Sequence, residues 1–163
     1  MTSLVLVHVL ISLIGIVTGF VVVFGLIGGK RLDRWTAVFL VTTILTSLTG
    51  FMLPAHKILP SHIIGFISLL MLAVACAARY PLRLVGVWRS TYVVTSTVAL
   101  YFNVFVLVFQ SFLKVPALKA LAPTQSEPPF AIAQSFVLIL FLVLGFMAVR
   151  GFRATPQALA AAR

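Results

Sequence analysis

Uninterrupted apolar runs constrain this chain more than any other feature. The first run covers residues 4–27 and contains no Lys, Arg, Asp or Glu. A helix needs about 20 mostly apolar residues to cross the hydrocarbon core of a membrane. Four further runs reach or approach this length: 35–53, 62–78, 90–113 and 130–149. The sequence therefore predicts an all-α, polytopic membrane protein in which a bundle of five transmembrane helices fills the single domain 1–163.

The composition excludes several classes of protein. Hydrophobic residues make up 62% of the chain and charged residues only 9%, whereas soluble domains have about 45–50% and about 25%. A soluble enzyme, a nucleic-acid-binding domain and a disordered chain are all excluded, because a chain this short cannot bury so much apolar surface in water. The net charge of +10 does not indicate a nucleic-acid partner either, because the basic residues stand in short clusters between the apolar runs. The expected surroundings are a lipid bilayer.

The basic clusters also predict an orientation. Nine of the twelve basic residues fall on one side of the predicted membrane and three on the other. Cytoplasmic loops carry an excess of Lys and Arg, so we expect the N-terminus outside, the C-terminus inside and a cytoplasmic tail over 150–163. The first group is Lys30, Arg31, Arg34, Arg79, Arg83, Arg89, Arg150, Arg153 and Arg163, and the second is Lys57, Lys114 and Lys119.

Three details of the connections can also be predicted. Pro116 at a helix start and Pro123 after it indicate a short interfacial helix over 116–122 outside the membrane. The segment 82–88 is typical of chain that lies at the cytoplasmic interface. Asp33 stands among Lys30, Arg31 and Arg34, and we expect it to pair with these neighbours.

Small residues indicate where helices approach one another. Ser12, Gly15 and Gly19 fall on one face of the first span, and Gly50 and Gly65 offer similar surfaces on the second and third. Small residues let helix backbones come close in a membrane. These residues predict packing grooves within the chain or, alternatively, the seam of a homodimer.

One polar face runs along the fourth span. Tyr92, Ser96, Asn103 and Gln110 follow at offsets of four, seven and seven residues and so share a helix face, and Gln134 adds an amide on the fifth span. A lipid-facing amide would lack hydrogen-bond partners. The face therefore predicts either hydrogen bonds between helices or the wall of a path for a substrate, an ion or a quinone.

The three histidines share the predicted outer boundary with Glu127. Three interpretations are open. In one, His8 and His62 bind a b-type haem from two helices. In another, the histidines, His56 among them, bind copper or zinc together with Glu127. In the third, the imidazoles simply lie at the headgroup boundary, where a half-polar ring is well solvated.

No other catalytic chemistry is indicated. The sequence has neither a phosphate-binding glycine-rich loop nor a nucleophile elbow, so it predicts neither a kinase nor a hydrolase. Its single cysteine, Cys76, stands among alanines and valine and is typical of a packing residue.

A resemblance adds an expectation about location. In Asn103, in the segment Lys114-Val115-Pro116-Ala117-Leu118 and in Glu127-Pro128-Pro129-Phe130, the chain resembles small multi-span bacterial inner-membrane proteins that have no assigned activity. The resemblance implies a bacterial inner membrane and no catalytic residues.

These observations favour a small accessory or interaction subunit without catalytic chemistry of its own, which works with a membrane-protein partner or as a homo-oligomer. One alternative is a haem or metal redox protein with its histidines at the outer leaflet. Another is an oligomeric channel or transporter lined by the polar face of the fourth span.

Overall fold

The predicted spans fold as helices. A computed structural model of the protein describes residues 3–53 and 60–153. Five long helices in these ranges are long and apolar enough to cross a membrane, which confirms the all-helical fold and the five candidate spans. The elements are α1 (Ser3–Ile27), α2 (Asp33–Met52), α3 (Pro60–Arg79), α4 (Val87–Lys114), the short α5 (Pro116–Leu121) and α6 (Pro128–Gly151).

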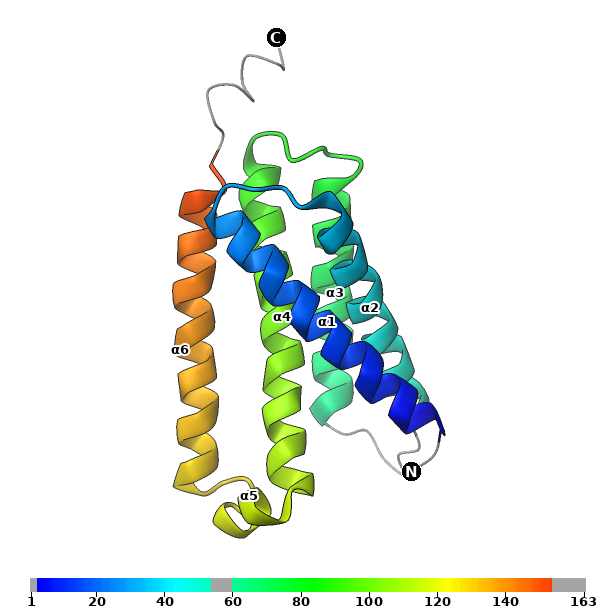
Figure 1. The fold of residues 1–163 in the computed structure, drawn as a ribbon, viewed down its shortest axis with the longest axis vertical. Helices are drawn as coiled ribbons and strands as arrows, with labels where there is room; N and C mark the ends of the chain where they lie inside the picture. Colours follow the sequence, from blue (N-terminus) through cyan, green and yellow to red (C-terminus); the bar gives the residue numbers. More distant parts are fainter. Residues whose placement is uncertain (1–2, 54–59, 154–163) are drawn as a thin grey trace.

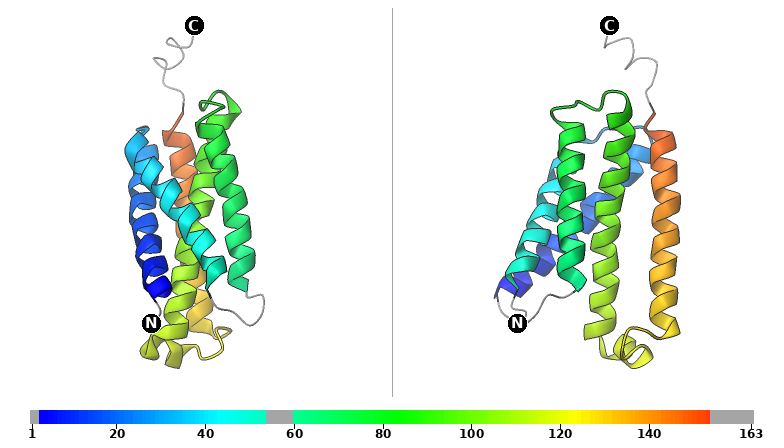
Figure 2. Two further views of the ribbon diagram at one scale, coloured as in Figure 1. Left: turned by 90° about the vertical axis from the view of Figure 1, so that its right-hand side faces the viewer. Right: turned by 180° about the vertical axis from the view of Figure 1, so that it is seen from behind.

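The five long helices run up and down between two ends of the bundle (Figure 1). We call one the arginine end; it holds the connections after α1 and α3 and the end of α6. The opposite, histidine end holds the start of α1, the end of α4, and α5. Helix α1 crosses the bundle diagonally, packs along α2 and reaches α6 at the arginine end, while α4 lies between α3 and α6 (Figure 2).

Two predicted small residues stand where α1 crosses its neighbours. A Cβ atom added at Gly19 would lie 2.5 Å from Leu100 Cδ1 on α4 and 2.9 Å from Phe39 Cε2 on α2. One added at Gly15 would lie 3.2 Å from the hydroxyl oxygen of Thr42. A side chain at Gly19 would therefore force Leu100 and Phe39 to move, whereas one at Gly15 would make only a tight contact.

Aromatic rings join α6 to the rest of the bundle. The ring of Phe141 lies 5.7 Å from that of Tyr101 on α4 and 5.8 Å from that of Phe20 on α1, measured between centroids. Near the arginine end the backbones of α6 and α1 come still closer, because Gly151 packs directly on Ile27. Most of the remaining surface of α6 is apolar and exposed.

The connection between α3 and α4 is a tight turn. Its backbone folds back on the end of α3, where the N–H of Leu84 donates to the carbonyl oxygen of Ala78 at 3.0 Å. The side chain of Leu84 is buried in the core. Part of the predicted interfacial segment 82–88 thus serves to close the bundle, and its last two residues already belong to α4.

The two halves of the bundle are packed differently. Fully buried side chains concentrate toward the arginine end and the middle of the molecule, and they include Val23, Leu26, Phe39, Leu72, Ala75, Tyr92, Val93 and Leu100. Toward the histidine end, α1, α2, α3 and α4 enclose a space that their side chains do not fill.

Candidate functional site

The candidate site is a cavity at the histidine end of about 390 Å³. Side chains of α1, α2, α3 and α4 line it, and most of its wall is apolar. A largely apolar cavity of some hundreds of Å³ with a few convergent polar groups is the usual form of a small-molecule site. The polar or ionisable lining residues are His8, Ser12, Thr46, Ser47, His62, Ser68, Asn103, Gln110, Ser111 and Lys114.

His8 and His62 both line this cavity, from α1 and α3. The Nδ1 atom of His8 lies 2.8 Å from the hydroxyl oxygen of Thr49 on α2. The imidazole lies close to α2 at Gly50, where an added Cβ atom would lie 3.5 Å from His8 Cε1, an ordinary contact distance. The ring of His62 stacks on Phe51 with centroids 5.7 Å apart. The structure thus brings the two predicted haem ligands to one space.

The inner part of the cavity is lined by small polar side chains. The Asn103 amide donates to the Thr43 hydroxyl oxygen at 3.4 Å, which links α4 to α2. Ser68 on α3 is only 3% exposed, and its hydroxyl has no hydrogen-bond partner in the described part of the chain. A buried hydroxyl without a partner is costly, so Ser68 has hydrogen-bonding capacity for a molecule in the cavity.

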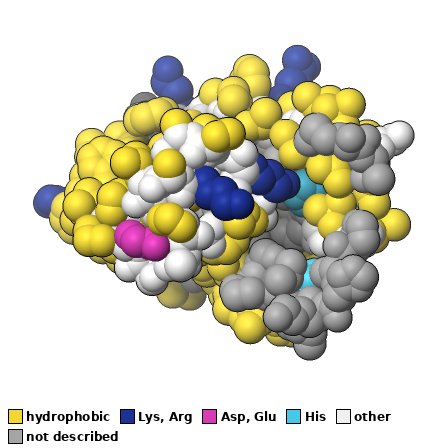
Figure 3. Space-filling view, turned by 90° about the horizontal axis from the view of Figure 1, so that it is seen from below, with side chains coloured by type: hydrophobic (Ala, Val, Ile, Leu, Met, Phe, Trp, Pro, Cys, Tyr) yellow, Lys and Arg dark blue, Asp and Glu magenta, His cyan; other side chains and the backbone are white. Residues whose placement is uncertain are grey.

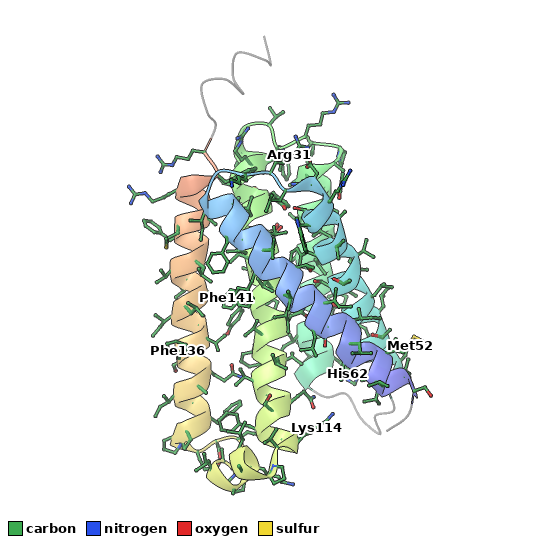
Figure 4. The ribbon with its side chains drawn as sticks, viewed as in Figure 1. Arg31, Met52, His62, Lys114, Phe136 and Phe141 are labelled. Carbon is green, nitrogen blue, oxygen red and sulfur yellow. The ribbon has the colours of Figure 1, made fainter. Side chains whose placement is uncertain are left out.

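The mouth of the cavity carries a positive charge. Gln110 and Lys114 stand one helical turn apart near the end of α4, and the side chain of Lys114 is exposed. Lys114 and His62 lie at the same end of the bundle, opposite Arg31 (Figure 4). Seen from this end, the surface is hollowed beside histidine and basic side chains (Figure 3). No Asp or Glu is among the described residues that line the cavity.

The cavity ends about halfway along the bundle. From Lys114 at its mouth to Asn103 is a rise of about 16 Å along α4 at 1.5 Å per residue, roughly half of the ~30 Å hydrocarbon thickness. Beyond Asn103 the buried side chains of Phe39, Leu72 and Leu100 fill the space between the helices. The cavity therefore does not continue toward the arginine end.

This floor divides the polar face predicted on α4. Asn103 and Gln110 line the cavity, whereas Tyr92 and Ser96 are buried beyond its floor, toward the arginine end. Gln134 on α6 is also separate from the cavity, and its amide donates to the Phe105 carbonyl oxygen at 3.1 Å. The face therefore does not line one continuous path in this structure.

The predicted small residues also fall into two groups, one that lines the cavity and one that lies outside it. Ser12, Gly50 and Gly65 line the cavity, while Gly15 and Gly19 lie at the crossing of α1 with α2 and α4. The Ser12 hydroxyl donates to the carbonyl oxygen of Val9 in its own helix at 2.8 Å, and among the described residues it makes no hydrogen bond to another helix.

Glu127 is held by its own loop. It accepts hydrogen bonds from the Thr124 N–H at 3.1 Å, from the Thr124 hydroxyl at 2.9 Å and from the Ser126 N–H at 3.1 Å. Desolvation raises the pKa of Glu127, but these hydrogen bonds to the charged form outweigh it and place the pKa below its ordinary value.

The predicted metal site includes a residue that the structure does not describe. His56, the expected companion of Glu127, lies outside the described residues, so their pairing stays a prediction. Among residues 3–53 and 60–153, no three His, Cys, Asp or Glu side chains gather where they could hold a metal ion.

A second polar cluster, which the sequence reasoning missed, lies at the arginine end. The buried guanidinium of Arg79 forms an ion pair with Asp33 and donates to the Arg31 carbonyl oxygen at 3.3 Å. Its Cζ atom lies 5.1 Å from the centroid of the Tyr92 ring. Asp33 pairs with Arg31 as predicted, at 3.0 Å. It also pairs with Arg79, which was not among its expected partners and whose side chain is buried. The sequence contained one signal for this ion pair, because Asp33 is the one acidic residue at this end of the bundle.

The chain matches no known protein family, no curated protein and no solved structure.

Proposed function

We propose that this chain is a multi-pass protein of a bacterial inner membrane, with its N-terminus outside and its C-terminus in the cytoplasm. Five long apolar helices support the membrane location. The distribution of charge supports the orientation, because cytoplasmic ends are enriched in Lys and Arg. In the described ranges the arginine end has Lys30, Arg31, Arg34, Arg79, Arg83, Arg89, Arg150 and Arg153, and the histidine end has Lys114 and Lys119.

Within that membrane the protein is an accessory protein that binds a small amphipathic molecule in the cavity at its outer, histidine end. The observation that carries this proposal is the cavity itself, which has apolar walls. At its inner end lies the buried hydroxyl of Ser68, which has no hydrogen-bond partner among the described residues. The apolar part of such a molecule would pack against the walls, and a polar group on it would form a hydrogen bond with the Ser68 hydroxyl. The closed floor favours holding a ligand over conducting one.

Extraction and mass spectrometry of the purified protein test this function. We expect one amphipathic compound to copurify in a fixed ratio to the protein after the annular lipid has been exchanged. The variant Ser12→Leu fills the cavity without removing a hydrogen bond between helices, and it should lose the compound.

Val17→Leu is the matched control, because it also introduces a leucine into α1, but on the exposed side of the helix. It should retain the compound. Equal retention by the wild type and both variants, or no compound in any of them, would refute the proposed binding function.

A second candidate function is favoured by the geometry of His8. The Thr49 hydroxyl donates to the Leu45 carbonyl oxygen at 2.7 Å, so its oxygen accepts from Nδ1–H of His8 and leaves Nε2 with its lone pair. Ligating histidines are commonly oriented through their other ring nitrogen, and His62 lines the same cavity. A b-type haem on these two histidines predicts a sharp reduced-state absorption band that His8→Ala abolishes. A colourless, iron-free protein excludes this candidate.

A further inference from the structure

We infer that the molecule in the cavity is an acidic amphiphile: one apolar chain with an anionic group, a carboxylate or a phosphate, held at the mouth by Lys114. This inference rests on the proposed binding function and specifies the chemistry of the ligand.

The first argument is the charge at the mouth. Lys114 is the one Lys or Arg among the described lining residues, and no Asp or Glu lines the cavity with it. Lys114 forms no ion pair in the described part of the chain, where both recorded ion pairs belong to Asp33. Glu127, the other described carboxylate, already accepts three hydrogen bonds in its own loop. An ammonium group that lies beside an apolar cavity and forms no ion pair with the described residues selects a negatively charged headgroup.

The second argument is the size and shape of the cavity. Its volume of about 390 Å³ lies near the lower limit for small-molecule sites. Spread over a depth of roughly 16 Å, this volume corresponds to the cross-section of about one hydrocarbon chain. This volume therefore suits a ligand with a single apolar chain.

The third argument is the direction in which such a chain would lie. Lys114 stands at the open mouth, and the apolar side chains of Leu13, Ile16, Phe102 and Val106 line the wall between the mouth and the floor. The headgroup would thus stay at the level of lipid headgroups while the chain passes inward, parallel to the lipid chains around the protein.

Binding of radiolabelled probes to the protein in phosphatidylcholine nanodiscs tests the inference, with empty discs subtracted. The probes are oleate, 1-oleoyl-lysophosphatidate and the neutral oleyl alcohol, all with the same chain. Above neutral pH we expect an anionic probe to bind about tenfold more tightly than the alcohol, the size of one charge-assisted hydrogen bond. The better of the two anionic probes identifies the headgroup as carboxylate or phosphate.

Two kinds of variant distinguish the effect of the Lys114 charge from the effect of the cavity volume. Lys114→Gln should abolish the preference for anionic probes, while Lys119→Gln, an exposed basic residue on α5 at the same end, should retain it. Equal binding of acid and alcohol to wild type and Lys114→Gln would overturn the inference but leave the proposed function intact if Ser12→Leu still abolishes binding. Binding that Ser12→Leu does not reduce would overturn both.

Discussion

The guanidinium of Arg79 is buried at the arginine end, although removing a guanidinium from water is costly. Only 2% of the residue is exposed, whereas 70% of the side chain of its partner Asp33 is exposed. The carboxylate thus compensates the buried charge while remaining hydrated itself. The Tyr92 ring and the Arg31 carbonyl oxygen also contact the guanidinium, whose Nη1 atom has no hydrogen-bond partner among the described residues. This cluster fixes the start of α2 against the end of α3.

Loss of this carboxylate should destabilise the protein. In Asp33→Asn the buried charge of Arg79 loses its counter-ion, and we expect a cost of about 1–3 kcal/mol. Cys76, the single cysteine and half-buried, reports unfolding through its reaction with a fluorogenic maleimide during heating. Arg31→Gln is the control, because its exposed ion pair is worth less than about 1 kcal/mol. Equal transition temperatures for the two variants would contradict the compensating role of Asp33.

Glu127 should make the loop before α6 sensitive to acid. Its folded-state pKa is lowered by the hydrogen bonds from Thr124 and Ser126. The stabilisation is therefore present above the ordinary glutamate pKa and is lost as the pH falls through the lowered value. Amide-exchange protection of Thr124 and Ser126 should decrease over that range in the wild type. In Glu127→Gln it should be low already at neutral pH, and unchanged protection in this variant would show that the carboxylate does not order the loop.

At the scale of the helices, the close approach of α1 and α6 depends on Gly151. A Cβ atom at this position would lie 2.1 Å from the carbonyl oxygen of Ile27 and 2.7 Å from its carbonyl carbon. These are backbone atoms, so neither can rotate away, and the two helices would have to separate.

The variant Gly151→Ala should therefore lower the unfolding temperature in the Cys76 assay. Gly145→Ala on the same helix is the matched control, since its Cβ atom would lie 3.5 Å from Thr97 Cγ2, an ordinary contact. The control should be neutral or gain up to about 1 kcal/mol from helix propensity. If both variants unfold at the wild-type temperature, α1 and α6 do not pack as closely as described.

Elements of this protein could be predicted from the sequence because length and hydrophobicity alone identify helices that cross a membrane. The predicted ends of the helices were less accurate. Helix α4 begins at Val87, three residues before the predicted span, after Gly86 with a φ of +55°. Position along the sequence does not show where a loop residue such as Leu84 enters the core, because that depends on how the neighbouring helices pack.

The cavity belongs to the scale of the whole molecule, and only its ingredients could be predicted. Helical periodicity places Asn103 and Gln110 on one face, and the spans place His8 and His62 near one boundary. Whether these residues line one space depends on the angle at which α1 crosses the bundle and on the packing beyond Asn103. Neither can be read from a single sequence.

The proposed orientation predicts which residues can be reached from outside the cell. In a Cys76→Ala background, Lys119→Cys should react with a membrane-impermeant maleimide in intact cells. Arg83→Cys should react only after the membrane has been permeabilised, because the arginine end faces the cytoplasm. The opposite pattern would invert the orientation and place the cavity mouth at the inner leaflet.

The central claim is that an amphiphile occupies the cavity between α1, α2, α3 and α4. Photolabelling in vesicles tests it most directly, with a diazirine-bearing long-chain acid or the corresponding alcohol, followed by peptide mapping. The account predicts labels concentrated on the lining residues of these four helices, near Ser47, Gly65 and Asn103, and lost in Ser12→Leu. Labels spread over the exposed face of α6, around Ile139 and Val143, and unaffected by Ser12→Leu, would contradict it.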